Sequence, residues 1–505
     1  MRILHLISSM DPRTGGPCAG IRNLFPCVSA AGHAVEVVCL DDPRSDYLST
    51  ESVRIHALGR GRGWWSYHPA LRPWLEQNLP RFDAVILNGL WLYPGFVLSK
   101  LARHPNTPPY FIFPHGMLDP WFQRAPERRW KAVRNWFYWK LIEQHVVRRA
   151  AALLFTCAEE MRLARETFQP YQPRREVVVG YGINPPPEQH AGMKAAFAKK
   201  CPGLNGRPYF LFLGRIHPKK GVDLLIKAYA EVFHQKAESR KQKVEREKTE
   251  VRYQKSEVGS QRSEGARTNA ETLKAEMPDT SSGLRPPFPQ GGEGMAERTI
   301  LRTPMVGHNS QPSTLNFQPA LVIAGPGLDT PYGQEMQRLA GRCEQAEASG
   351  EHSTSNSSLN APRSVLFPGM LTGDAKWGAI YGCEAFVLPS HQENFGIAVA
   401  EALACGRPVL ISNQINIWRE IAGDKAGLVE ADTLEGTQKL FQKWEDLPLD
   451  DKVSMSCSAR MSYQNRFSIA FAAEKLVAAM AKVTGRMGNK TTDHGTTDHK
   501  ENAES

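Results

Sequence analysis

The sequence predicts an α/β protein in which two Rossmann-like, doubly wound domains face each other across a cleft. Short β-rich segments alternate with helical segments through the first half, and the same alternation restarts in the second half. A proline-rich break at residues 184–187 separates the halves. Such alternation is typical of mostly parallel sheets covered by helices. The 505 residues leave room for two domains even without the most polar stretches.

The first half, residues 1–185, is predicted to be the N-terminal domain. Helical segments such as residues 21–31 and 159–167 follow its strands. The seven predicted strands are residues 3–8, 34–40, 53–58, 84–88, 110–113, 152–156 and 176–179.

The second half is predicted to consist of an interdomain linker, residues 186–207, and a domain, residues 208–465. A helix at residues 466–485 is expected to cross back to the first domain, and residues 486–505 are expected to form a disordered tail. The predicted strands of this domain are residues 209–213, 320–324, 364–367, 385–388, 409–412 and 427–429.

Two polar stretches interrupt the second domain. Residues 236–318 contain 14 basic and 11 acidic residues among 83 and almost no apolar periodicity. That near balance of charge argues against a nucleic-acid-binding arm and predicts a solvated, disordered insertion, although a docking segment for a partner stays open. Residues 344–363 are expected to be a second, short polar insertion.

The composition of the chain limits the cellular compartments and the binding partners that are expected for it. The nine cysteines show no paired spacing, so neither a disulfide framework nor a zinc site is expected. No segment approaches the ~20 apolar residues that span a bilayer, which predicts a cytoplasmic protein. Residues 121–150 carry eight basic and two acidic residues interleaved with aromatic ones. They suit the anionic inner face of the plasma membrane, or else their aromatic side chains belong to the core.

The strongest functional signal lies at residues 388–412, where a strand, a loop and a helix follow each other. The helix begins near Gly396, and its free N–H groups make a site for phosphate. Glu401 lies about five residues into the helix, roughly 7 Å along its axis. This spacing suits a diphosphate at the helix tip and a ribose beside Glu401. Glu393, in the loop, can reach a sugar hydroxyl on the other side of the phosphates.

A second signal is the loop from Gly214-Arg215 to Lys220-Gly221, which follows a strand and precedes a helix. Departure of a nucleoside diphosphate develops negative charge on its oxygens. Arg215 can neutralise that charge through two hydrogen bonds, and Lys220 can do so as a point charge.

These two segments resemble the Glu-x7-Glu and Gly-Arg…Lys-Gly motifs of retaining GT-B glycosyltransferases, in particular the polysaccharide and glycolipid enzymes of glycosyltransferase family 4. The resemblance implies a hexosyltransferase that uses a nucleotide-sugar donor and a glycan or lipid-linked acceptor, with no metal, no cofactor and no nucleic acid. The sequence departs from the family pattern at residues 180–184, where Tyr181 and Asn184 replace the usual polar pair.

The resemblance also implies roles for individual residues. His115, in a His-Gly at a strand end, and Glu393 are the expected catalytic residues, and Glu401 binds the ribose. The expected diphosphate-binding residues are Arg215, Lys220, Gly16, Asn394, Phe395, Gly396 and Ile397. Acceptor-side candidates are Gly15, Asn88, Asp119 and Trp121.

Two other classes of protein stay open. One is a non-catalytic GT-B-like protein that binds a sugar nucleotide or scaffolds a polysaccharide assembly. The other, suggested by the formal charge of +10, is a nucleic-acid-binding protein, although no groove-reading helix or aromatic sheet motif supports it.

Overall fold

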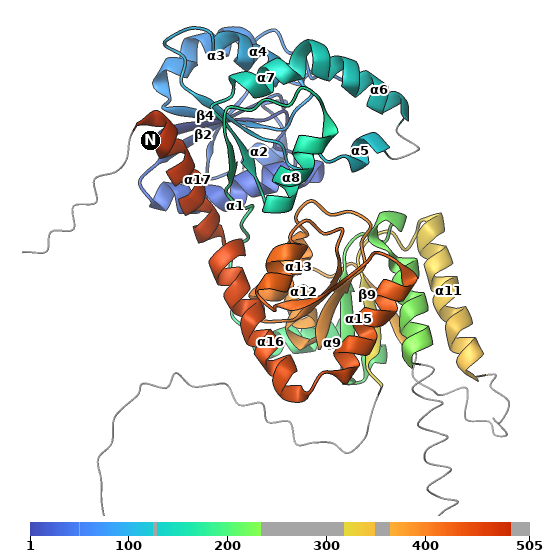
Figure 1. Ribbon diagram of the computed structural model, residues 1–505. Coiled ribbons are helices and arrows are strands. Elements are labelled where there is room, and N and C mark those ends of the chain that lie inside the picture. Colours follow the sequence, from blue (N-terminus) through green and yellow to red (C-terminus); the bar gives the residue numbers. More distant parts are fainter. Residues whose placement is uncertain (50, 125–128, 234–317, 349–363, 486–505) are drawn as a thin grey trace, which may run out of the picture. The chain divides into compact units, whose positions relative to one another are not determined.

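The computed structural model describes residues 1–49, 51–124, 129–233, 318–348 and 364–485 (Figure 1). Both sheets described below belong to one compact unit. Nearly all of the predicted insertion 236–318, most of the stretch 344–363 and the whole tail 486–505 lie outside the described residues.

The first sheet has seven parallel strands in the order β3-β2-β1-β4-β5-β6-β7, as a doubly wound fold requires. Each predicted strand of the first half is present. The strands are β1 (Arg2–Leu6), β2 (Ala34–Cys39), β3 (Arg54–Ala57), β4 (Ala84–Asn88), β5 (Tyr110–Phe113), β6 (Ala152–Phe155) and β7 (Glu176–Val178).

The second sheet has six parallel strands in the order β10-β9-β8-β11-β12-β13, so the strand order reverses direction between β8 and β11. In open parallel sheets the ligand site lies at the carboxyl ends of the strands at such a reversal. The strands are β8 (Tyr209–Leu213), β9 (Ala320–Ala324), β10 (Val365–Gly369), β11 (Ala385–Leu388), β12 (Val409–Ser412) and β13 (Gly427–Glu430).

Helices connect the strands of both sheets (Figure 1). Those associated with the first sheet are α1 (Gly16–Ala30), α2 (Asp46–Ser49), α3 (Leu71–Asn78), α4 (Tyr93–Leu101), α5 (Trp121–Arg124), α6 (Arg129–Tyr138), a π-helical turn (Trp139–Glu143), α7 (Gln144–Arg149) and α8 (Ala158–Thr167). Those associated with the second are α9 (Ala191–Lys200), a 3-10 turn (Pro218–Lys220), a helix over residues 222–233, α11 (Pro331–Ala348), α12 (Gly373–Gly382), α13 (Ile397–Ala404), α14 (Trp418–Gly423), α15 (Leu434–Asp446) and α16 (Leu449–Ser462). A second π-helical turn (Tyr463–Phe467) leads into α17 (Ile469–Thr484), and short 3-10 turns lie at Pro12–Thr14, Leu79–Arg81 and Pro202–Leu204.

The last helix, α17, packs against α1 and completes the core on that face of the first sheet (Figure 1). Ile469, Ala472, Leu476 and Met480 recur at the spacing of one helix face and are buried there. Gly182, just before the second half, must be glycine because a Cβ would lie 2.7 Å from the Cβ of Ala472.

Two segments differ from the sequence-based outline. The predicted linker contains α9, whose Met193 and Phe197 are buried as an i, i+4 pair and which packs against α12. The stretch that begins at residue 344 starts as the last turn of α11, which continues to Ala348. There Glu344 accepts hydrogen bonds from the backbone N–H groups of Ser364 (3.0 Å) and Val365 (3.2 Å) and so fixes the start of β10.

Among the described residues, no helix is both long enough and apolar enough to cross a bilayer. Cys39, Cys157 and Cys405, which the sequence places in apolar runs, are buried in the core.

Candidate functional site

Two loops meet where the strand order of the second sheet reverses. One follows β8 and carries Lys219 and Lys220, and the other follows β11. The carbonyl oxygen of Lys219 accepts hydrogen bonds from the backbone N–H of His391 (2.9 Å) and from the Ser390 hydroxyl (3.0 Å). These bonds tie the loops together at the carboxyl edge of the sheet.

Lys220 and Glu393, one from each loop, form an ion pair. Both side chains are mostly buried, with 22% and 17% of their surface exposed, so solvent screens the pair only weakly. The backbone of Glu393 is fixed because its N–H donates to Gln414 O (2.9 Å) and its carbonyl accepts from Asn416 N–H (3.0 Å). The structure thus places the predicted phosphate-binding lysine against the predicted sugar-binding carboxylate.

The N-terminus of α13 lies directly after Glu393. Gly396 caps it in the left-handed conformation, φ 76°, and no side chain caps the first turn. Its N–H groups are therefore available to an anion. Phe395 is buried, so only its backbone can contribute, whereas Ile397 is exposed. The Asn394 side chain points instead toward Thr156, the residue directly after β6, with 3.5 Å between Asn394 Nδ2 and Thr156 Oγ1.

Glu401 lies in the second turn of α13, as the sequence predicts. Its carboxylate pairs with the ammonium of Lys376 on α12 at 2.7 Å. Sequence reasoning missed Lys376, because nothing in the spacing of α12 marks that lysine as different from other surface lysines. The pair holds Glu401 in place beside the helix N-terminus.

Arg215 lies in the loop after β8, and its side chain is exposed. No ion pair of its guanidinium is found within the described part of the chain. Because Lys220 is already paired, Arg215 is the more accessible of the two predicted diphosphate-binding cations.

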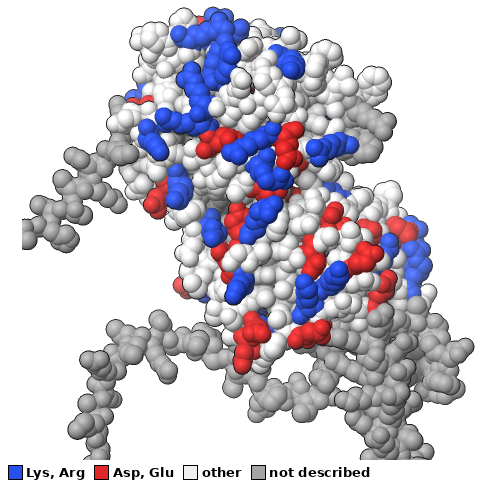
Figure 2. Space-filling model, viewed as in Figure 1, with Lys and Arg blue, Asp and Glu red and all other residues white. Residues whose placement is uncertain are grey.

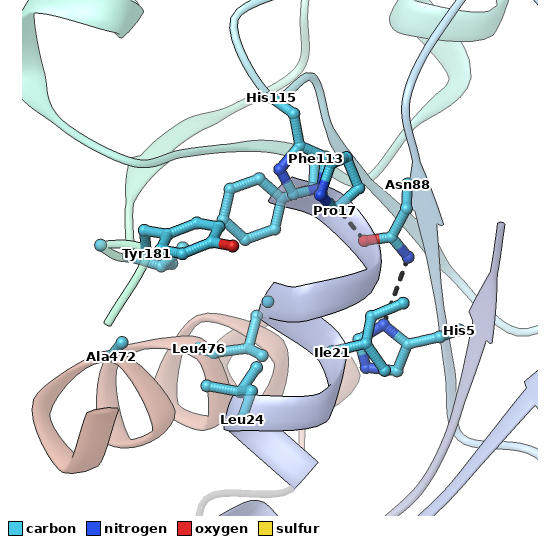
Figure 3. Close-up of a pocket in the computed structure, with 13 residues that line it drawn as sticks. His5, Pro17, Ile21, Leu24, Asn88, Phe113, His115, Tyr181, Ala472 and Leu476 are labelled. Atoms are coloured by element: carbon cyan, nitrogen blue, oxygen red, sulfur yellow. Dashed lines mark hydrogen bonds between the residues drawn. The ribbon is translucent and has the colours of Figure 1, made fainter. Parts of the chain in front are cut away.

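On the first sheet, His115 follows β5 in the left-handed conformation, φ 51°. Its ring stacks on that of Phe113, with centroids 4.5 Å apart. His115 Nε2 lies 3.2 Å from Asn88 Oδ1, and Asn88 Nδ2 lies 3.2 Å from His5 Nδ1 (Figure 3). Burial lowers the pKa of His115 to about 3 and that of His5 to about 4, so both rings are neutral at pH 7.

These hydrogen bonds assign the proton on His115. The Asn88 amide donates to His5 Nδ1, so its oxygen must accept from His115 Nε2–H. His115 Nδ1 is then the nitrogen without a proton. Asn88, predicted on the acceptor side, is buried with both polar atoms engaged. Its role in this arrangement is to orient His115.

The cavity that His5, Asn88 and His115 line is small (Figure 3). Its volume is about 20 Å³, room for little more than one water molecule. Gly15, φ 95°, precedes α1, and the Tyr181 hydroxyl donates to the carbonyl of Gly16 at 2.6 Å. Tyr181, one of the two residues that depart from the family pattern, thus contacts the double-glycine loop.

Three close approaches join residues after β11, two in its loop and one in α14, to the loop after β5 and to α8. Gln392 Nε2 donates to Asp119 Oδ2 at 2.9 Å, and a Cβ at Gly116 would lie 2.7 Å from Asn394 Cγ. Arg419 Nε donates to Glu159 Oε2 at 2.9 Å. Asp119 is buried and also accepts a hydrogen bond from the Trp121 N–H. It therefore acts by holding Gln392 and Trp121 in position.

Glu160 is a further residue that sequence reasoning missed. This buried carboxylate accepts from the N–H of Gly116 (2.6 Å), the N–H of Thr156 (2.7 Å) and the Thr156 hydroxyl (2.6 Å). The Glu160 carboxylate thus holds the His115-Gly116 turn through the backbone N–H of Gly116. Its position in the first turn of α8 resembles that of many helix-capping acids, so the sequence gives no signal for this role.

A larger pocket of about 650 Å³ is lined by residues of the same two loops, Lys219 and His391 among them. This volume is typical of small-molecule sites. Trp121, an acceptor-side candidate, lines it, and the ammonium of Lys219 lies 5.1 Å from the centre of the Trp121 ring. The other lining residues include His217, Asp223, Tyr332 and Arg342.

Within the described residues, no group of three or more His, Cys, Asp or Glu side chains is placed to hold a metal.

Two doubly wound parallel sheets in one chain, with a strand-order reversal in each, are the architecture of the GT-B fold. Two family models match the chain: a glycosyl transferase 4-like domain over residues 15–182 and glycosyl transferases group 1 over residues 313–460. Together these segments cover more than half of the sequence. The chain belongs to the GT-B glycosyltransferases and resembles those of glycosyltransferase family 4.

Solved structures of similar fold match most of the chain. Sucrose-phosphate synthase from Thermosynechococcus elongatus matches with 17% identity and a TM-score of 0.56, covering 96% of this chain and 100% of that one. HepE from Anabaena, in complex with UDP and glucose, matches with 13% identity and a TM-score of 0.57, covering 95% and 100%. A glycosyltransferase from Rickettsia africae matches with 12% identity and a TM-score of 0.59, covering 95% and 98%. Comparison with curated protein sequences gives no match.

Proposed function

We propose that this glycosyltransferase moves a hexose from a nucleoside-diphosphate sugar to a hydroxyl acceptor, with retention of configuration, in cell-surface polysaccharide or glycolipid synthesis. One observation supports it above the others. The Lys220–Glu393 pair lies at the strand-order reversal, directly before an uncapped helix N-terminus, with Glu401 one turn further on. The HepE structure, of similar fold, holds UDP and glucose.

In this mechanism the departing diphosphate is stabilised by Arg215, Lys220 and the N–H groups of α13. When the diphosphate takes the ammonium of Lys220, Glu393 is released to accept a hydrogen bond from a hydroxyl of the transferred sugar. The leaving phosphate oxygen accepts the proton of the incoming hydroxyl on the same face, which accounts for retention without a protein nucleophile. His115, proton on Nε2, offers Nδ1 as an acceptor for a hydroxyl of the sugar.

The acceptor is proposed to enter the pocket that Trp121 lines. An aromatic face suits the apolar face of a sugar ring, and Lys219 next to it suits an acceptor that carries a negative charge.

The test of the proposal is a panel of nucleotide sugars. The protein is incubated with each one, and free nucleoside diphosphate is measured with and without candidate acceptors. We expect one donor to be consumed, at an unchanged rate in excess chelator, and NMR of the product to show the donor's anomeric configuration. Donor binding without any release of diphosphate would instead favour a non-catalytic scaffold. Inhibition by chelator would refute the metal-independent step.

Glu401→Gln is expected to weaken nucleotide binding and leave the fold intact. The ribose diol loses a charged acceptor, and such hydrogen bonds contribute about 1.5–3 kcal/mol, or roughly 10- to 100-fold in Kd. Calorimetric titration with the nucleoside diphosphate measures the change. Glu435→Gln, an exposed carboxylate in the first turn of α15, is the control and should bind as the parent does. Equal affinity in both variants would contradict the ribose assignment.

His115→Gln is expected to make the melting temperature less sensitive to acid. In the unfolded chain a histidine takes up its proton near pH 6.5, but burial lowers the pKa of His115 to about 3 in the folded chain. Between these values the unfolded state binds more protons, so this part of the stability is complete above pH 6.5 and is lost as the pH falls toward 3. Melting curves across that range check it. His104→Gln, an exposed histidine outside the His115 cluster, is the control for the loss of an imidazole.

A further inference from the structure

Exposed apolar side chains gather on one helix of the first domain. The continuous helical segment 129–149 comprises α6, the π-helical turn and α7. Its outer face carries large apolar side chains that are between 50% and 88% exposed. They are Trp130, Val133, Trp136, Phe137 and Leu141, and are called the α6 stripe below.

The α6 stripe is separate from the core contacts of the same helix. Tyr138, Trp139, Glu143 and Val146 lie on the opposite face and are buried. The sequence leaves open whether the aromatic residues of 121–150 belong to the core or face a membrane. Tyr138 and Trp139 belong to the core, whereas the aromatic side chains of the stripe do not. Packing within the described chain leaves the stripe uncovered.

The charge around the stripe is positive. Lys131, Arg134 and Arg148 are exposed, Lys140 is half-buried, and none of the four is in an ion pair with a described residue. The one carboxyl side chain in residues 129–149 is that of Glu143, whose pKa burial raises to about 8, so it is mostly uncharged at pH 7. Figure 2 shows Lys and Arg side chains, with few acidic ones, over the upper part of the view, where Figure 1 places α4 and α7.

Two of these cations lie against aromatic rings. The Arg134 guanidinium lies 5.4 Å from the ring centre of Trp64, itself well exposed, and the Lys140 ammonium lies 5.7 Å from that of Trp136. A long cationic side chain beside an aromatic ring can keep its charge at the level of lipid headgroups while the ring enters the acyl boundary.

We propose that the α6 stripe and its flanking cations dock the protein on an anionic lipid bilayer. Apolar side chains along one face, Trp and Phe among them, supply the buried area. Lys131, Arg134 and Lys140 supply attraction to negatively charged headgroups. The proposal goes beyond the glycosyl transfer proposed above, because it concerns where the enzyme works and no residue of the donor site takes part.

Flotation with lipid vesicles tests it. The full chain is mixed with vesicles of phosphatidylcholine alone and with vesicles of equal parts phosphatidylcholine and phosphatidylglycerol. Binding is expected to the anionic vesicles and to weaken at high salt. Lys131→Gln with Arg134→Gln should lower the partition coefficient by about 25-fold, about five-fold for each charge. Arg128 and the side chain of Arg129, also basic, lie outside the described residues and are left unchanged.

The apolar half of the proposal has a matched control. Phe137→Ser with Leu141→Ser removes an exposed i, i+4 pair from the stripe and should abolish flotation. Leu449→Ser with Val453→Ser removes an equally exposed i, i+4 pair from α16 and should float as the parent does. The charge control is Lys199→Gln with Lys200→Gln, both exposed at the end of α9. Melting temperature and donor hydrolysis in solution should stay at parent values in all four variants.

Three results would overturn the proposal. They are the absence of flotation with anionic vesicles, equal loss in the stripe and control variants, and flotation indifferent to lipid charge. Stripe-dependent self-association without flotation, seen by light scattering, would also overturn it and identify a second copy of the chain as the occupant.

Discussion

Lys220→Met is expected to lower turnover by about 100-fold or more, as removal of one transition-state donor does in other enzymes. The ammonium of Lys220 is mostly buried, and in the absence of donor it neutralises Glu393. The variant loses the charge that we propose stabilises the leaving diphosphate, and it also leaves Glu393 unpaired in a partly buried site. Both effects act at the reacting centre, so turnover should fall more than donor affinity.

Steady-state kinetics with the donor found in the nucleotide-sugar panel measure this effect. The control Lys439→Met removes an exposed ammonium from α15, away from both loops and from the pocket that Trp121 lines, and should keep near-parental turnover. Arg215→Ala, which removes the more accessible cation of the same loop, should also lose about 100-fold. Parental kinetics in both Lys220→Met and Arg215→Ala would exclude this loop as the diphosphate site.

The sequence predicts the sheets well because their strands are buried on both sides. Every residue of β4, β5 and β9 is buried, and each strand is an apolar run except for Asn88 at the end of β4. The π-helical turn within residues 129–149, by contrast, cannot be recognised in the sequence. Its apolar residues have the same spacing as those of the helices on either side. The alternation of strands and helices does not by itself give the strand order. The reversal between β8 and β11 is expected only because doubly wound folds follow general connection rules.

The candidate site is predicted less completely, and the missing residues share a property. Lys376, Glu160 and Gln392 each act through a partner distant in sequence: Lys376 on Glu401, Glu160 on the turn after His115, and Gln392 on Asp119. A sequence motif identifies ligand-binding residues that lie close together in the chain, on one loop or one helix. A contact between two elements far apart in the chain leaves no such motif, so only the folded chain shows it.

Gly221→Ala is expected to reduce turnover about as strongly as Lys220→Met, although it removes no functional group. Gly221 has φ 64°, and a Cβ there would lie 2.3 Å from the carbonyl oxygen of Pro389. An alanine forces the loop after β8 away from the loop after β11. The hydrogen bonds to the Lys219 carbonyl and the Lys220–Glu393 pair must then lengthen or break. The glycine after the lysine is therefore needed for the distance between the two loops.

The control for Gly221→Ala separates backbone strain from the lost approach. Gly206 has a similar φ, 74°, but a Cβ there would meet no atom within 4 Å. Gly206→Ala should thus show only the cost of a left-handed alanine, about 1 kcal/mol, and keep parental turnover. Melting curves and kinetics on both variants decide the matter. If Gly221→Ala melts lower than Gly206→Ala yet turns over donor at the parental rate, then the close approach of the loops supports the fold and not the transfer.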